Sequence, residues 1–450
     1  MKIIVIGAGE VGTYLSHLLS GKGHEVTVID SNEQKAAMLD EQINAKVITG
    51  NGSSGGMIKQ AGVDRCDYFL ALTSDDKTNL VACSLAKVLS SKVKTVARIH
   101  DQTYGDNSII NYQLHFGIDY LLNPEALCAL ELAKAMRNPT RLAVENIARG
   151  QVEVQQVTVS RSSKVVDKSL RDIKLDAGVR IGFIKHGSEV SLPTADTVIK
   201  DGDIVALFGR PEDLLEVRTK FDPGCRLDTV RVVLFGASET AISLLRLLNN
   251  PRFKIRIIEK DPNLCRSLAE RFEHVTIIQG DATSLRVLEE EQIDAADYFV
   301  ACTKDDEDNI MTSLQASRLG AEHVQLVINR ADYQEVINTI KTTLGVELIV
   351  SPRLATANEI LRTISPDMIV ELASLDKANA KIVEIKIAAD SAIAGKKLKD
   401  ISLPPGTVII ALMHKYAAKV PGPEDSVIGG DRVVAIVRSA EMPALIRTVE

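Results

Sequence analysis

The sequence predicts an α/β protein built from two tandem modules. Each module is expected to hold a Rossmann-like, doubly wound parallel sheet followed by a small α+β domain. Short segments of Val, Ile and Leu alternate with amphipathic helical segments, as in parallel sheets that are covered by helices on both faces. The pattern also occurs twice, because Gly7 and Asp30 recur 229 positions later as Gly236 and Glu259.

The repeating unit fills about half of the 450-residue chain, which is too long for a solenoid repeat. We therefore expect four domains. Two are Rossmann-like nucleotide-binding domains, at 1–123 and 230–350, and two are small C-terminal domains, at 140–222 and 368–450.

The composition is that of an ordinary soluble globular protein, with 45% hydrophobic and 25% charged residues. A net charge of −7 gives no basic field for nucleic acid. The apolar runs are far shorter than the roughly 20 residues needed to span a bilayer, and no signal peptide is expected, so we predict a cytoplasmic protein. Six scattered cysteines without Cys-x-x-Cys spacing are expected to be reduced, mostly buried thiols, namely Cys66, Cys83, Cys128, Cys225, Cys265 and Cys302.

The elements of the first Rossmann-like domain follow from hydrophobic periodicity. A helix is expected at 77–89, where apolar residues recur every three or four positions. Pro124 is expected to start a helix over 125–136, since proline is tolerated in the first turn, and Asn138-Pro139 to end it. The predicted strands are 2–6, 25–29, 46–49, 67–72, 94–99 and 118–121.

The small domains show a different pattern. Alternating apolar and polar residues at 151–160 and 381–388 predict half-exposed strands, which turns rich in Gly and Pro separate from their neighbours. We place domain boundaries near Pro139 and near Phe221–Gly224.

The first glycine loop has the pattern of a dinucleotide-binding turn. It follows a strand, opens a helix and is followed by an acid at the end of the next strand. Gly7 allows the tight turn, Gly9 lets the backbone approach a pyrophosphate, and Gly12 permits close packing of helix and strand. Asp30 is placed to accept hydrogen bonds from ribose hydroxyls, and it disfavours a 2′-phosphate. The predicted phosphate-binding residues are Gly7, Ala8, Gly9, Glu10, Val11 and Gly12.

The second loop has the altered pattern Gly-Ala-Ser, with Ser238 in place of the middle glycine. A side chain there crowds a pyrophosphate, whereas Ala241 is an accepted third residue. This copy either binds a smaller or differently placed nucleotide, such as ATP or ADP, or has lost its ligand. Its candidate residues are Gly236, Ser238, Glu239, Thr240 and Glu259.

Further polar residues follow the third and fourth strands, at the sheet edge where such folds bind ligands. Those after the third strand are expected near the adenine. Thr73 and its neighbours either contact ligand or cap the next helix, and the two roles are compatible. The acidic run 305–308 is interpreted as a solvated helix start rather than a metal site. These edge candidates are Asn51, Gly52, Thr73, Ser74, Asp281, Ala282 and Thr303.

Arg98 is expected to end the fifth strand, and Arg330 to end its counterpart. An arginine at this edge binds a terminal phosphate with two parallel hydrogen bonds, or it pairs with an acid across a subunit contact. The sequence leaves both alternatives open.

With these motifs, the chain resembles the TrkA family, the regulatory subunits of Trk potassium-uptake systems. The resemblance covers nearly the whole chain. It implies a cytosolic protein that assembles as a homo-oligomeric, tetrameric ring on a TrkH-like membrane potassium transporter. It also implies that NAD(H), ATP and ADP bind the Rossmann-like halves and set transport activity. By the family motif, the residues in contact with the first nucleotide are Gly7–Val11, Asp30, Thr73, Ser74 and Arg98.

The alternative from another class is an NAD-dependent oxidoreductase, because the same fold serves both functions. Hydride transfer requires a positioned acid–base group beside the nicotinamide. His186 and His414 occupy matching positions in the small domains, but the sequence shows no Lys or Asp constellation around them. A DNA-binding repressor is disfavoured because no helix-turn-helix with a basic face is evident. We therefore predict a regulator and not an enzyme.

Overall fold

The structure is a computed structural model of the whole chain. It describes all residues except 106–109, 138–151, 177, 188, 225–228, 331–332, 334–340, 342–343, 365–367, 376–378 and 415–416. The chain divides into two compact units. Unit 1 holds both Rossmann-like halves and consists of Met1–Arg137 and Asp228–Ser365; unit 2 consists of Asn138–Leu227 and Pro366–Glu450.

The first half of unit 1 is a six-stranded parallel sheet in the order β3-β2-β1-β4-β5-β6, which is the doubly wound order. All six predicted strands form, and their ends differ from the expected ones by at most two residues. The strands are β1 (Lys2–Ile6), β2 (Glu25–Asp30), β3 (Lys46–Thr49), β4 (Tyr68–Ala71), β5 (Lys94–Arg98) and β6 (Tyr120–Leu122). The helices are α1 (Glu10–Gly21), α2 (Glu33–Gln42), α3 (Gly55–Gln60), α4 (Asp76–Leu89), α5 (Tyr112–His115) and α6 (Pro124–Arg137).

The second half repeats this sheet in the order β13-β12-β11-β14-β15-β16, again with parallel pairing throughout. The predicted fold class is thereby confirmed for both copies. The strands are β11 (Val230–Phe235), β12 (Phe253–Glu259), β13 (Thr276–Gln279), β14 (Tyr298–Ala301), β15 (His323–Val327) and β16 (Leu348–Val350). The helices are α8 (Glu239–Leu247), α9 (Pro262–Arg271), α10 (Leu285–Glu290), α11 (Asp306–Leu319) and α13 (Pro352–Ile364).

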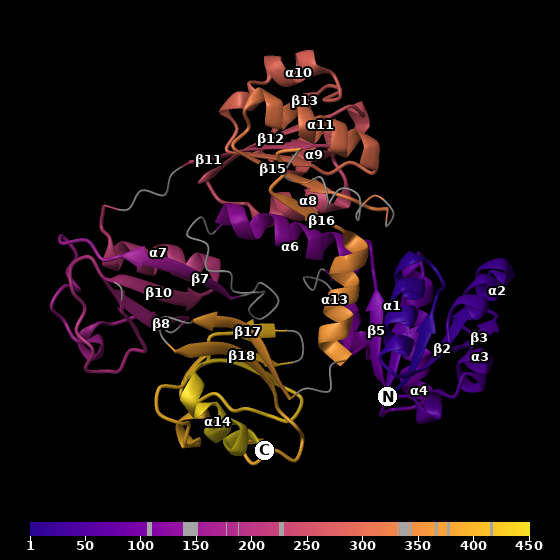
Figure 1. Cartoon of the computed structure of the whole chain (residues 1–450), viewed down its shortest axis with the longest axis horizontal. Coiled ribbons are helices and arrows are strands. Elements are labelled where there is room, and N and C mark those ends of the chain that lie inside the picture. Colours follow the sequence, from indigo (N-terminus) through magenta and orange to yellow (C-terminus); the bar gives the residue numbers. More distant parts are fainter. Residues whose placement is uncertain are drawn as a thin grey trace. The chain divides into compact units, whose positions relative to one another are not determined.

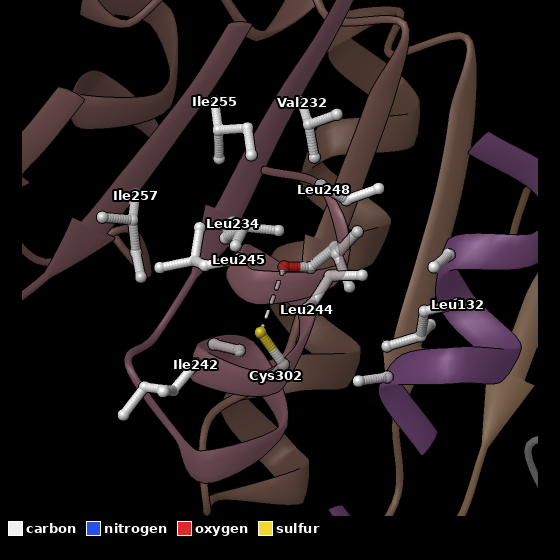
Figure 2. Close-up of a cluster of buried hydrophobic side chains, with 14 of the residues drawn as sticks. Leu132, Val232, Leu234, Ile242, Leu244, Leu245, Leu248, Ile255, Ile257 and Cys302 are labelled. Atoms are coloured by element: carbon white, nitrogen blue, oxygen red, sulfur yellow. Dashed lines mark hydrogen bonds between the residues drawn. The ribbon is translucent and has the colours of Figure 1, made fainter. Parts of the chain in front are cut away.

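The two halves exchange their last helices. α6 ends the first half, but its buried face packs on the second sheet beside α8, where Leu132 meets Leu244 and Leu248 in one apolar cluster (Figure 2). In return, α13 packs on the first sheet beside α1, with Ile360 and Leu15 in a common cluster (Figure 1). Because each helix fills the core of the other half, neither sheet is fully covered by its own segment of chain.

α6 begins at Pro124 as expected and ends at Arg137. The predicted stop at Asn138-Pro139 lies outside the described residues. Among the described cysteines, all are free and buried, namely Cys66, Cys83, Cys128, Cys265 and Cys302, as the sequence predicted. None of the described helices combines the length and the apolar character that a bilayer crossing requires.

Unit 2 contains two antiparallel sheets, β7-β10-β8-β9 and β17-β18-β21-β19-β20. One apolar cluster joins them, and Gly182 marks their close approach, because a Cβ there would lie 2.2 Å from Phe208 and 2.5 Å from Ile436. α7 and α14 cover the other faces. The elements of the first sheet are β7 (Glu153–Thr158), β8 (Val179–His186), β9 (Glu189–Ser191), β10 (Ile204–Gly209) and α7 (Pro211–Phe221). Those of the second are β17 (Ile369–Leu375), β18 (Ala380–Lys386), β19 (Val408–His414), β20 (Ala417–Lys419), β21 (Arg432–Arg438) and α14 (Met442–Val449).

Candidate functional site

The first glycine loop has the geometry that the sequence predicted. Gly7 has a φ of +101°, which favours glycine, and its N–H donates to the Ile29 carbonyl at 2.8 Å. A Cβ at Gly12 would lie 1.9 Å from the Gly7 carbonyl oxygen, so helix and strand pack closely there. At Gly9 a Cβ would meet nothing within 4 Å. The loop is therefore tight where it packs and open where it faces the edge of the sheet.

The amino terminus of α1 begins at this open position. Gly9 is its N-cap residue and offers no side chain to accept a hydrogen bond from the first turn. The first N–H groups of α1 therefore lack an acceptor from this residue, and the helix dipole adds partial positive charge at the same point. This arrangement is suited to an anion.

Asp30 fixes the loop from the neighbouring strand. One carboxylate oxygen accepts from the Ala8 N–H at 2.5 Å, and the other accepts from the Asn32 N–H at 2.7 Å. The side chain is partly exposed and lines the pocket described next. Asp30 thus has a structural role in holding the loop, besides any contact with a ligand.

A pocket of about 740 Å³ opens at the carboxyl edge of the first sheet. Its lining brings together most of the predicted residues of the first copy, namely Gly7, Gly9, Glu10, Val11, Asp30, Asn51, Gly52, Thr73, Ser74 and Arg98. Ala8 and Gly12 are not among its lining residues. Ala8 instead lines a neighbouring pocket of about 610 Å³ beside α1 and α2.

Thr73 and Asp75 hold the segment between β4 and α4. The Thr73 hydroxyl donates to Asn79 Oδ1 at 2.7 Å, and Asp75 caps α4 by accepting from the Thr78 N–H at 2.8 Å. The hydrogen bonds from Thr78 hold the pKa of Asp75 below its ordinary value. The helix-capping role is therefore confirmed for this segment, while ligand contact stays a prediction.

Arg98 ends β5 as predicted and lines the pocket. Its Nε is buried and has no hydrogen-bond partner. Burial lowers the pKa of its guanidinium, and the carboxylates of Glu125, Asp76 and Glu10 act in the opposite direction. A buried guanidinium nitrogen without an acceptor, beside an open pocket, is suited to an anionic ligand.

The prediction that Arg330 is the counterpart of Arg98 was wrong. Asn79 Nδ2 donates to the Arg98 carbonyl at 2.8 Å, and the equivalent Asn309 Nδ2 donates to the Val327 carbonyl at 3.0 Å. Val327 therefore occupies the place of Arg98 in the second half. Arg330 lies three residues beyond the strand, where it forms an ion pair with Glu307 at 3.7 Å.

In the second loop, two side chains accept hydrogen bonds from nearby backbone N–H groups. Ser238 Oγ accepts from the Ala241 N–H at 3.4 Å and so caps α8. Glu259 is buried, and its two oxygens accept from Ala237 and Asp261 N–H groups, each at 2.8 Å. The remaining candidates lie along the same edge of the second sheet, namely Gly236, Glu239, Thr240, Asp281, Ala282 and Thr303. The second site thus differs from the first at both the loop and the strand-end arginine.

The acidic run 305–308 is only partly the solvated helix start that we expected. Asp305 caps α11, but Asp306 is 2% exposed. Its carboxylate accepts from the Asn329 and Arg330 N–H groups, each at 2.8 Å. Within the described part of the chain, no group of His, Cys, Asp and Glu forms a metal-binding cluster.

The histidines of the small domains each have an acidic partner, which the sequence analysis missed. His186 Nδ1 lies 2.5 Å from Asp203 Oδ1, and His414 Nδ1 lies 2.7 Å from Asp431 Oδ1. The other oxygen of each aspartate accepts a backbone N–H from its own turn. The repeated Gly-Asp pairs at 202–203 and 430–431 were the sequence signal that could have indicated these acidic partners. These contacts tie a strand end to a turn.

Sequence reasoning also missed part of the first pocket. Its lining includes Lys35 and Glu125, together with three residues from the second half, namely Asn329, Pro352 and Arg353. The helix exchange brings Pro352 and Arg353 to the first site, since both lie at the start of α13, whereas Asn329 follows β15. The repeat of Pro124 at Pro352 was a signal for the helix start but not for its position in space.

Comparison with known proteins agrees with this arrangement. The TrkA-N domain model matches residues 3–124 and 232–352, and the TrkA-C domain model matches residues 154–222 and 382–449. This chain belongs to the TrkA family. The Trk system potassium uptake protein TrkA homolog 1 of Methanosarcina mazei is 31% identical over 441 residues, covering 96% of each chain. The TrkA protein of Halomonas elongata is 29% identical, covering 97% of this chain and 96% of that one.

Solved structures support the fold of this TrkA-family chain. The GsuK channel bound to NAD has a TM-score of 0.57 at 19% identity, covering all of this chain and 78% of that one. The GsuK RCK domain has a TM-score of 0.56 at 18% identity, covering all of this chain and 94% of that one. Tandem RCK-type modules are therefore the architecture of this chain.

Proposed function

We propose that this TrkA-family protein regulates potassium uptake by binding adenine nucleotides, NAD(H) or ATP/ADP, in the first-half pocket. The observation that carries the proposal is the open anion site at the Gly9 end of α1, with Arg98 facing the same pocket. The nucleotide phosphates meet the N–H groups of α1, and the ribose meets Asp30. A 2′-phosphate is disfavoured by the Asp30 charge, which selects unphosphorylated ribose.

The regulated partner in this proposal is a TrkH-like membrane potassium transporter. The relatives named above are potassium uptake proteins, and the proposed location is the cytoplasmic face of the membrane, with several copies of the chain forming a tetrameric ring. Nucleotide shifts the transporter only if it binds two states of the ring with different affinities. A tenfold difference is worth about 1.4 kcal/mol per site, and coupled sites add their contributions.

The second half is proposed to bind nucleotide weakly or not at all. Ser238 already caps α8, and Val327 provides no charge where Arg98 stands in the first half. The two halves then differ in function, with one binding the ligand and the other responding to it.

We propose a regulatory role rather than oxidoreductase catalysis. His186 and His414 are each held by a buried aspartate at a strand end in unit 2. The described residues that line the proposed nucleotide pocket belong to unit 1. Its residues therefore bind and orient the nucleotide without an assigned acid–base group, and the nucleotide leaves unaltered. A screen for a change in nicotinamide absorbance tests this directly, and sustained turnover of a substrate would contradict it.

The substitution Gly9→Ser tests the binding site, because it gives the first loop the sequence of the second. A Cβ at this position meets nothing within 4 Å and its φ is −77°, so the fold is expected to be retained. The side chain would occupy the pyrophosphate position, and the Kd for NADH, ATP or ADP is expected to rise about tenfold or more by calorimetry. Ser238→Gly is the matched control and should leave first-site binding unchanged. A Gly9→Ser variant with normal circular dichroism and full affinity would refute the site.

A pull-down from detergent-solubilised membranes, with and without ATP, tests the partner. Recovery of a potassium transporter whose amount or activity changes with nucleotide supports the regulatory role. Recovery that is equal in every nucleotide state, with equal transport, would contradict it.

A further inference from the structure

Arg353 belongs to the second half of the chain but lies at the nucleotide pocket of the first. It is the second residue of α13, directly after Pro352. It lines both the main pocket, with Gly7 and Gly9, and the neighbouring pocket beside α1. The helix exchange explains this position, because α13 crosses to pack on the first sheet.

The Arg353 side chain is held over the amino-terminal end of α1. Its guanidinium carbon lies 4.9 Å from the centroid of the Tyr14 ring, in a cation–π contact. Tyr14 is one helical turn after Glu10, the first residue of α1, so the guanidinium is oriented close to the open end of the helix. Arginine commonly combines stacking on an aromatic ring with hydrogen bonding to phosphate.

The hydrogen-bonding capacity of Arg353 is not used up by the protein. Its Nε is buried without a hydrogen-bond partner, as is the Nε of Arg98, which lines the same pocket. Leaving a buried charged donor unsatisfied is costly, so two such groups lining one cavity indicate an anion between them.

The acidic residues that line the pocket have other partners in the loop and helix ends. Asp30 accepts from backbone N–H groups at both oxygens, and Asp75 accepts from Thr78. Glu125 is paired with His100 through one oxygen, at 2.9 Å, and its other oxygen is buried without a hydrogen-bond partner. The exposed acid Glu10 is free to turn toward solvent. Arg353 and Lys35 are therefore available to an anionic ligand, whereas the charge of Arg98 is partly balanced by Glu125, Asp76 and Glu10.

We propose that Arg353 is a phosphate-binding residue of the first-half nucleotide site, supplied by the second half. This inference rests on the proposed nucleotide binding, and it adds that the bound nucleotide connects the two halves of the chain. The phosphates of the bound nucleotide lie between the amino terminus of α1 and the Arg353 guanidinium. Because Arg353 opens a helix whose Ile360 is buried in the first core, phosphate binding ties the edge of the second sheet to the first site. Ligands with more phosphate charge strengthen this connection between the second sheet and the first site.

Calorimetric titration with ADP tests the proposal on the full-length chain. Arg353→Gln is expected to raise the Kd for ADP about 10- to 100-fold, which is the usual effect of losing a charged hydrogen bond to phosphate. Arg353→Lys keeps the charge but loses the planar fork, so its Kd should lie between those of the wild type and the Gln variant. Arg286→Gln is the matched control, because it removes the same charge from an 80% exposed side chain in the second half. It should bind ADP as the wild type does.

The outcomes separate this inference from the function on which it rests. If the wild type does not bind ADP, the proposed ADP binding fails and the inference fails with it. If the wild type binds ADP and Arg353→Gln binds equally well, only the role of Arg353 is overturned. Equal weakening in the Gln and Lys variants, together with a lower melting temperature of both ligand-free proteins, would show a packing role and also overturn it. Should the Gln variant not fold, the Lys variant decides, and a Kd within about twofold of the wild type overturns the proposal.

Discussion

The helix exchange between the two halves is tested most directly at Leu132. This side chain on α6 is fully buried in a cluster that joins α6 to the second half, with Leu244 and Leu248 nearby (Figure 2). Leu132→Ala removes three carbon atoms and leaves a cavity, since the surrounding β-strands and helices relax only in part. The expected cost is about 3–5 kcal/mol of unfolding free energy, a large fraction of the 5–15 kcal/mol typical of a domain.

Hydrogen exchange shows where that stability is lost. If α6 belongs to the core of the second half, Leu132→Ala should reduce the amide protection of β11 and α8 about 100-fold or more. The strands of the first sheet should be less affected. Leu264→Ala is the matched control, because Leu264 lies on α9 of the second half with 41% of its surface exposed. It should cost less than about 1 kcal/mol. Unchanged protection of β11, or a loss confined to the first sheet, would refute the exchange.

Two further predictions concern a half-buried aspartate and a buried ion pair. The Asp119 carboxylate accepts a hydrogen bond from Lys87 Nζ at 2.7 Å. Burial raises the pKa of Asp119, but hydrogen bonds from Lys87 and Thr95, together with the charge of Lys94, have a larger effect in the opposite direction. The pKa of Asp119 is therefore below its usual value of 3.8. Its contribution is therefore present above about pH 4 and is lost as the pH falls through the lower folded value. Urea melts should show Asp119→Asn less stable than the wild type by about 1–3 kcal/mol at pH 7, with the two curves converging in acid; a constant difference at all pH values would contradict this. In unit 2, Glu384 and Arg432 form a buried ion pair, with side chains 2% and 10% exposed. Arg432→Met should cost about 3–5 kcal/mol by leaving a buried carboxylate without this partner, whereas the double variant Glu384→Leu/Arg432→Met should recover most of the loss, and equal melting of both variants would argue against it.

Local patterns were sufficient to predict the elements and the first loop. Strand residues such as Ile3 and Val26 are apolar because both faces of a parallel sheet are covered, so hydrophobic runs mark the strands. The glycine positions could be predicted because each has a local requirement, namely a positive φ at Gly7 and close packing at Gly12. Asp30 followed from its place at the end of the next strand.

The correspondence between the two copies was harder to predict. Arg330 lies 232 positions after Arg98, whereas the glycine loops are 229 positions apart. The offset of 229 leads to Val327, which is also where hydrogen bonding places the counterpart of Arg98. Asp203 lies 17 residues from His186, and only the pairing of strands and turns brings them together.

The sequence by itself determined that this chain has two tandem modules with parallel sheets, and that only the first has a complete glycine loop. These features depend on residues within one strand, turn or helix, where side-chain periodicity and backbone sterics act locally. Only the tertiary structure decided that α6 and α13 change places and that Arg353 reaches the first pocket. The sequence of an amphipathic helix predicts which face is buried, but it does not predict which of two similar sheets covers that face.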